Sequence, residues 1–224
     1  MKSRDIWNLW FESLSWCVSN GLEILDLSNA RLSGKLIDEL GQFKNPVILS
    51  LGNNSILGPI PWSIGNLSSL RSLNLETNQI NGTLPESFGH LSKLESLNIY
   101  SNMLEGVVSE VHFTNLMRLT KLFASQNWLT LEVSDNWTPP FQVNNLVLGS
   151  WNLGPKFPSW LCSQEQLSIL DISNTGILDA VPPFILEPVF PAYVSKSLSQ
   201  SDLWRDSKYL NDFVLFFNNW YEFK

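Results

Sequence analysis

The feature that most constrains the fold of this chain is a sequence pattern that recurs every 24 residues, with one step of 25. Its cleanest copy reads LRSLNLETNQINGTLP, residues 70–85, with apolar residues at positions one, four, six and eleven and asparagine at position nine. The copies begin at Leu22, Pro46, Leu70, Leu94, Leu119, Val143 and Leu167. A pattern L-x-x-L-x-L-x-x-N-x-L at such a period is typical of a solenoid built from stacked units.

Each copy predicts one short strand followed by a turn. Leu73 and Leu75 point to one face of an extended strand and Asn74 to the other. So short a strand cannot bury its apolar face alone, and the copies must stack. We predict an α/β solenoid, a right-handed superhelix with a concave parallel sheet and an irregular or 3-10-helical convex side. Its parts are a partial repeat at 1–21, seven repeats at 22–190 and a non-repeat, possibly helical tail at 191–224.

Position nine falls where the chain turns away from the strand, and four copies have asparagine there: Asn54, Asn78, Asn102 and Asn127. An amide at this place can bond the carbonyls that the turn leaves without partners. The other copies have Ala30, Trp151 and Thr175, so their turns need another solution, and Trp151 marks a local irregularity.

The charge and the apolar content of the chain bear on two kinds of partner, nucleic acid and the lipid bilayer. The chain has 14 Lys and Arg against 21 Asp and Glu, a net charge of -7. Proteins that bind nucleic acid normally present a basic face, so nucleic acid is not expected as a partner. The apolar run at 213–217 is far shorter than the ~20 residues needed to cross a bilayer, so we expect no membrane span.

The N-terminal 20 residues do not predict a signal peptide. Asn8 and Glu12 interrupt the apolar stretch, and no small-residue cleavage site follows. We interpret them as the back half of a preceding repeat, because Cys17 and Cys162 both occupy position twenty of their units. Six strand spacings separate these cysteines by ~29 Å, whereas a disulfide needs α-carbons within ~7 Å. Each is therefore a small buried residue or half of a bridge to another molecule.

Longer motifs connect the repeats to a known family. The strings GPIPWSIGNLSSL (58–70) and GTLPESFGHLSKL (82–94) carry the L-x-G-x-I-P extension of plant-specific leucine-rich repeats. The run from CVSNGLEILDLSN through DNWTPPFQV to LGPKFPSWL and LDISNTGI resembles the ectodomain of plant leucine-rich-repeat receptor-like proteins, the group that includes fungal-elicitor receptors. The resemblance covers about residues 17–183.

The resemblance implies a non-enzymatic recognition module of a cell-surface receptor in defence or developmental signalling. It implies a peptide or protein ligand, or a co-receptor ectodomain, and a place at the extracellular face of the plasma membrane, without a cofactor or metal. Such receptors also have a signal peptide, cysteine-bearing caps, many repeats and a transmembrane helix, so this chain resembles an internal slice. Two alternatives stay open: a truncated gene product without specific function, and a secreted-hydrolase inhibitor similar to polygalacturonase-inhibiting proteins. Neutral to acidic strand rows disfavour the inhibitor.

The resemblance stops after Pro183. A helix is plausible over residues 201–220, because Ser201 or Asp202 can serve as N-cap and an apolar stripe follows at Leu203, Leu210, Phe213, Val214 and Phe217. One interpretation is a cap that shields the open edge of the last repeat. The other, which we favour, is an unrelated tail without an evolved partner.

Four N-x-S/T sequons lack proline at the middle position: Asn53, Asn66, Asn81 and Asn136. If the chain is secreted, glycans on Asn66, Asn81 and Asn136 would clothe the flank and the convex side. A glycan on Asn53, at position eight, would crowd the end of a concave strand.

The concave sheet is the expected binding surface, because its outward rows stand at positions two, three, five, seven, eight and ten. Those rows change character at the fourth and fifth copies. We predict a ligand-contact cluster there of three aromatic residues with polar neighbours: Tyr100, Phe123 and Trp128 with Glu76, Asn98 and Lys121. Aromatic anchors of this kind often dominate binding. The alternative is that they pack laterally between strands.

Catalytic and metal-binding signals are missing from the sequence. Only His90 and His112 are present, both at positions outside the concave sheet. No phosphate loop, nucleophile elbow or Cys/His metal cluster can be read. Gly58, Gly82 and Gly106 recur because the turn after the strand needs them. We therefore expect no enzyme activity.

Overall fold

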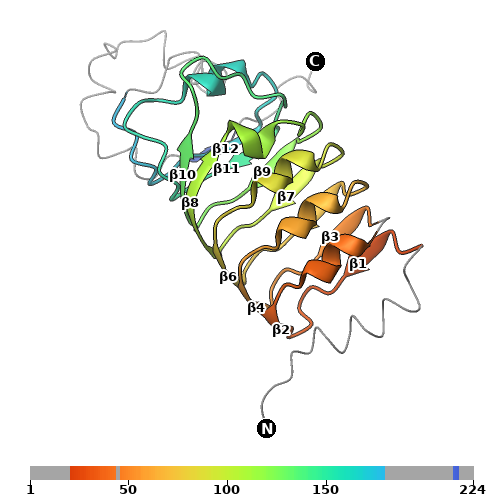
Figure 1. The fold of residues 1–224 in the computed structure, drawn as a ribbon. Helices are drawn as coiled ribbons and strands as arrows, with labels where there is room; N and C mark the ends of the chain where they lie inside the picture. The colour runs from red at the N-terminus through yellow and green to blue at the C-terminus, as the bar shows by residue number, and fades with distance from the viewer. Residues whose placement is uncertain (1–20, 44–45, 180–213, 217–224) are drawn as a thin grey trace, which may run out of the picture.

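The computed structural model describes residues 21–43, 46–179 and 214–216, the last three as backbone only. In Figure 1 these residues form a curved array of short strands with a row of short helices along it. The leading 20 residues, Cys17 included, and residues 201–213 and 217–220 of the predicted tail helix lie outside the described residues. Because the strands of successive copies pair parallel to one another, the array confirms the predicted solenoid.

The larger sheet has the order β1-β3-β5-β7-β9-β11-β12-β13. Its strands are β1 Ile24–Asp26, β3 Ile48–Ser50, β5 Ser72–Asn74, β7 Ser96–Asn98, β9 Lys121–Phe123, β11 Asn145–Val147, β12 Ile169–Asp171 and β13 Val214–Phe216. Each of the first seven begins two residues after the start of a copy of the sequence pattern. They pair in register, so that Leu73 faces Leu97 and Leu97 faces Leu122. These inward leucines are buried and form a continuous core along the array.

A second parallel sheet lies on the flank, in the order β10-β8-β6-β4-β2. Its strands are β2 Ser33–Lys35, β4 Ser55–Gly58, β6 Gln79–Gly82, β8 Met103–Ser109 and β10 Trp128–Glu132. The repeat pattern does not predict this sheet. Its register shifts by two pattern positions at each step, so that Glu105 at position twelve pairs with Trp128 at position ten. The expected glycines sit in it, and Gly58, Gly82 and Gly106 have φ of 79°, 78° and 92°.

The helices in the described part of the chain are all short 3-10 turns, as predicted for the convex side. They are η1 Asp38–Gln42, η2 Trp62–Asn66, η3 Glu86–His90, η4 Glu110–Phe113 and η5 Ser159–Ser163. His90 and His112 lie on η3 and η4, outside the concave sheet, as expected. His112 is buried and its Nε2 lies 3.0 Å from the carbonyl oxygen of Leu84. His112 therefore has a structural role, because it joins two neighbouring copies.

The position-nine asparagines tie each copy to the preceding one. The amide Nδ2 of Asn102 donates to the carbonyl oxygens of Leu75, Ile99 and Tyr100, at 2.9, 3.2 and 3.3 Å. Its Oδ1 accepts the backbone N–H of Ile80 at 3.1 Å. Equivalent bonds surround the other three asparagines, Asn54, Asn78 and Asn127. These bonds confirm the role predicted from the sequence.

The copies without asparagine solve the turn differently. The indole N–H of Trp151 donates to the carbonyl oxygen of Ala124 at 2.8 Å, so it keeps the bond to the preceding copy. The hydroxyl of Thr175 donates to the carbonyl oxygen of Ile172 at 2.7 Å, within its own copy. Trp151 is 2% exposed, which places an aromatic ring in the asparagine column. Both substitutions preserve one part of the asparagine pattern.

The predicted helix at the C-terminus is wrong for three of its residues. Val214–Phe216 forms strand β13, which pairs antiparallel with β12 so that Leu215 faces Leu170. The physical reason is that β12 would otherwise expose a row of unpaired backbone N–H and C=O groups, which an extended segment can satisfy. This pairing favours the interpretation of a cap over that of an unrelated tail, which the sequence alone favours.

We predict that Asn127→Ala lowers the free energy of unfolding by at least about 2 kcal/mol, because it strips partners from buried backbone groups of two copies. Trp151→Phe is the matched control. It should cost only about 1 kcal/mol, since Asn127 still donates to the carbonyl of Ala124. Urea unfolding of the full chain, followed by circular dichroism, measures both. Equal effects would contradict the proposed role of the asparagine bonds.

Candidate functional site

Residues at the same pattern position line up across the strands of the concave sheet, as the sequence predicts. At position five, sheet pairing aligns Asn74 with Asn98, Asn98 with Phe123 and Phe123 with Val147. The row ends at Asp171, which pairs with Val147. All five side chains are half-buried, so they form a surface that both packs and faces solvent. A row of this kind offers a bound chain apolar contacts at its centre and polar contacts on both sides.

A carboxylate network occupies the third and fourth copies. The amide of Asn98 donates to Glu76 Oε2 at 2.6 Å, and the amide of Asn74 donates to Glu76 Oε1 at 3.3 Å. Asn98 Oδ1 accepts the backbone N–H of Tyr100 at 3.1 Å. These bonds hold the Glu76 carboxylate in one place on the surface. A fixed anion costs less conformational entropy when a ligand binds it.

A second carboxylate network occupies the last copies. Asp171 Oδ1 accepts the hydroxyl of Ser173 at 2.6 Å, and its Oδ2 accepts the hydroxyl of Ser125 at 3.3 Å. Ser125 lies two copies away, and Gly149 stands between them. A Cβ on Gly149 would lie 2.9 Å from Ser173 Oγ and 3.0 Å from Asp171 Oδ2. The missing side chain therefore lets Asp171 reach across the intervening copy.

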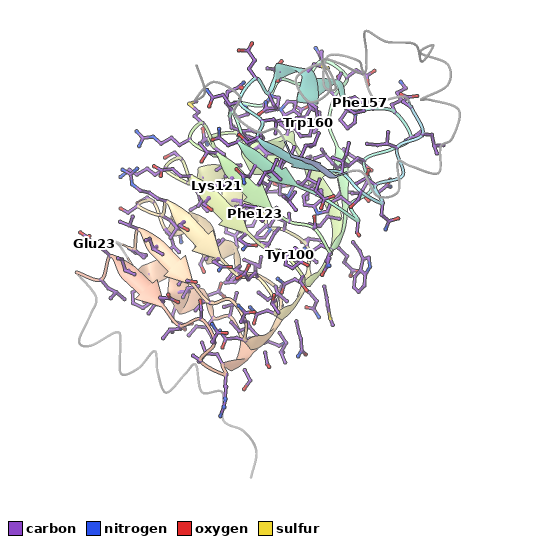
Figure 2. The ribbon with its side chains drawn as sticks, turned by 180° about the vertical axis from the view of Figure 1, so that it is seen from behind. Glu23, Tyr100, Lys121, Phe123, Phe157 and Trp160 are labelled. Carbon is purple, nitrogen blue, oxygen red and sulfur yellow. The ribbon has the colours of Figure 1, made fainter. Side chains whose placement is uncertain are left out.

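An apolar strip separates the two networks. It consists of Phe123 and Val147, with Tyr100 beside them on the adjoining copy. Figure 2 shows Phe123 and the exposed Lys121, both on β9, with Tyr100 from the segment just after β7, away from Phe157 and Trp160. The structure thus brings together five of the six predicted contact residues, Glu76, Asn98, Tyr100, Lys121 and Phe123, on one face.

Trp128, the sixth predicted contact residue, does not belong to this face. It opens β10 in the second sheet, and Met103, at the same position ten of the preceding copy, opens β8. The reason is the turn at position eight, where Ser101 and Gln126 have positive φ of 54° and 59°. The chain leaves the concave sheet there. Position ten is therefore the start of the flank.

The other residues singled out in the sequence have the following places. The sequon residues are all exposed: Asn53, Asn66, Asn81 and Asn136. Cys162 lies exposed on η5 with a free thiol, so the buried alternative is wrong for it, and partial burial raises its pKa. In the described ranges no cluster of His, Cys, Asp and Glu could hold a metal ion. No helix among these residues is long and apolar enough to cross a membrane.

Sequence reasoning missed two concavities near the sixth copy. A cavity of about 500 Å³ is lined by Leu131–Asp135 and Lys156–Trp160, with Leu153. A second of about 330 Å³ shares Trp160 and includes Trp137 and Cys162. The rings of Trp137 and Trp160 meet edge to face with centroids 5.5 Å apart. The spacing of these aromatic residues does not follow the repeat, so the pattern gave no signal for them.

Hydrogen bonding lowers the pKa of Asp26, at the N-terminal end of the position-five row. The main cause is the backbone N–H of Ser28, which donates to Asp26 Oδ1 at 3.0 Å, followed by the Ser28 hydroxyl. Because the folded pKa is depressed, the stabilisation is present above the ordinary pKa of aspartate and is lost as pH falls through the lowered value.

We predict that Ser28→Ala raises the pKa of Asp26 toward the ordinary range without reaching it, because the backbone donor remains. Carbon-13 NMR titration of the Asp26 carboxyl in the two proteins measures this. An unchanged titration curve would show that the hydroxyl makes no contribution. A fully ordinary pKa would show that the backbone bond does not form.

Comparison with protein-family models gives matches to the leucine-rich repeat at residues 68–129, 21–43 and 45–67. Among curated proteins, the chain is similar to receptor-like protein EIX1 of Solanum lycopersicum, with 47% identity over 75 residues. It is also similar to receptor-like protein EIX2 of the same organism, with 44% identity over 75 residues. Each match covers 34% of this chain and only 7% of the relative's length.

Several solved structures have a similar fold, receptors among them. The TDR receptor superposes with a TM-score of 0.61 at 29% identity, covering 69% of this chain and 27% of that one. The complex of PEPR1 with AtPEP1 superposes with a TM-score of 0.55 at 29% identity, covering 68% of this chain and 25% of that one. The Arabidopsis receptor kinase HAESA, in complex with the peptide hormone IDA and the co-receptor SERK1, has a TM-score of 0.54 at 25% identity. The match covers 67% of this chain and 29% of that one.

Proposed function

We propose, from the premise that this chain is a leucine-rich-repeat array related to plant receptor-like proteins, that its concave sheet recognises a peptide or protein ligand. The single observation that carries the proposal is the apolar strip at Phe123 and Val147 between two hydrogen-bonded carboxylates. We place such a module in defence or developmental signalling at the outer face of the plasma membrane; its relatives are named receptor-like proteins.

The geometry favours a ligand that crosses the strands. Glu76 and Asp171 belong to the third and seventh copies, four strand spacings apart, or ~19 Å at ~4.8 Å per spacing. An extended peptide rises ~3.3 Å per residue, so about six residues bridge the two carboxylates. This length suits a short linear peptide rather than a small metabolite.

The chemistry of the face indicates which peptide it prefers. A bulky apolar side chain at the centre would pack on Phe123 and Tyr100, where it loses contact with water. Cationic or N–H donor groups toward the ends would meet Glu76 and Asp171. Lys121, exposed on one side of the strip, would repel a basic residue and favour an acidic one or a free carboxylate. Charge and shape together therefore define an orientation.

Among the other hypotheses, a hydrolase inhibitor and a chain without specific function, neither gains support from a particular residue. The inhibitor would be favoured by basic concave rows, whereas the fixed charges at positions five and seven are Asp26, Glu76 and Asp171. An inactive chain would have no reason to hold carboxylates through copies that are not adjacent, as Asp171 is held by Ser125. These observations favour recognition.

We predict that peptides selected from a random linear library on the immobilised full chain carry an apolar centre flanked by Lys or Arg. Phe123→Ala and Tyr100→Ala should each weaken a selected peptide by about 30-fold, the effect of losing an aromatic anchor of about 2 kcal/mol. Isothermal titration calorimetry measures the affinities.

Trp128→Ala is the matched control for these variants. It removes an aromatic side chain that is 67% exposed and comes from the same copy as Phe123, but it changes the second sheet rather than the concave face. The affinity of Trp128→Ala for the selected peptide should equal that of the unmodified chain. Loss of binding in Trp128→Ala with none in Phe123→Ala would move the site to the flank and overturn the proposal.

A further inference from the structure

The outward face of the second sheet carries exposed apolar side chains. Inward residues of this sheet, such as Ile80, Leu104 and Leu129, are buried at 1% exposure or less. The outward side chains of Met103 and Trp128 are 45% and 67% exposed. Two more exposed apolar residues extend this surface along the sheet, Leu57 and Val107. We call these four the flank patch: Leu57, Met103, Val107 and Trp128.

Asn81 lies inside this patch. It is the third residue of β6, is exposed, and pairs in the sheet with Met103 of β8. Trp128 is one strand farther out, on β10, next to Glu105 of β8. Two strand spacings of ~4.8 Å and an offset of ~7 Å along β8, from Met103 to Glu105, put Trp128 about 12 Å from Asn81. Asn81 opens the sequon Asn-Gly-Thr, completed by Gly82 and the exposed Thr83.

The amide of Asn81 differs from those of the asparagines that hold the turns. The amide of Asn78, three residues earlier, donates to three carbonyl oxygens. The described residues offer the Asn81 amide no hydrogen-bond partner, so it is free to react. Asn66, by comparison, is exposed at the end of η2 on the convex side, away from the flank patch.

We propose that an N-linked glycan on Asn81 lies along the outward face of the second sheet and covers Met103 and Trp128. The proposal rests on the proposed cell-surface function, because it requires passage through the secretory pathway. Apolar faces of the sugar rings would pack on the two side chains and remove them from water. The glycan thereby closes the flank to protein partners and leaves the concave sheet open.

The attachment step is an ordinary transfer from a lipid-linked oligosaccharide diphosphate. A bond forms between Asn81 Nδ2 and C1 of the first N-acetylglucosamine, and the bond from C1 to the phosphate oxygen breaks. The lipid diphosphate leaves with the electron pair, and the amide releases one proton. Nothing in the chain is oxidised or reduced.

The test uses the full chain, secreted behind an added leader from cells that keep glycans in the high-mannose form. Mass spectrometry of peptides gives the occupancy of Asn81, and hydroxyl-radical footprinting gives the oxidation rates of Met103 and Trp128. We expect both rates to rise about threefold in Asn81→Gln, because oxidation follows exposed area and the glycan covers most of it. Met117, 69% exposed and outside both sheets, serves as internal reference.

Two further comparisons sharpen the result. Asn66→Gln, which removes a convex-side sequon, should leave all three oxidation rates unchanged. Trimming the glycan enzymatically to one sugar should keep Met103 protected and expose Trp128, because only Met103 is adjacent to Asn81 in the sheet. An unoccupied Asn81, or equal rates with and without its glycan, would overturn the proposal. Peptide selection on unglycosylated chain tests the concave site independently.

Discussion

The bond between the position-nine side chain and the preceding copy is the constraint on which the rest of the structure depends. A strand of three residues has few backbone bonds of its own, and the turn after it leaves carbonyl groups facing the interior. Asn102 satisfies carbonyl groups of two copies and accepts an N–H from the earlier one. Each copy is therefore fixed in register with its neighbour. Without that register, residues at position five would not line up.

Aligned rows are what convert a repetitive core into a specific surface. Inward leucines repeat because the core repeats, but the outward residues differ from copy to copy, as Asn98, Phe123 and Val147 do. Two glycines at position seven, Gly52 and Gly149, let polar side chains of the next copy lie over them. The carboxylate of Asp171 thus reaches Ser125 across a copy. Function in such an array depends on departures from the pattern.

Much of the fold could be predicted from the sequence, because period and apolar alternation specify the strands and asparagine specifies the turns. The second sheet could not, since its residues 79–82 show no strand signal by themselves and pair only after a shift of two positions. The turn at position eight, where Gln126 has a positive φ, explains why the prediction for Trp128 was wrong. Strand β13 was also missed, because its conformation depends on the open edge of β12 rather than on its own periodicity. The predicted contact residues of the concave sheet otherwise share one face.

The central claim is that the concave face between Glu76 and Asp171 binds a peptide that crosses the strands. The most direct measurement is a crystal structure of the full chain with a library-selected peptide. We expect the peptide to cross β7, β9 and β11, with an apolar side chain on Phe123 and cationic groups near the two carboxylates. A peptide bound on the second sheet, or in the cavities beside Trp160, would contradict this account.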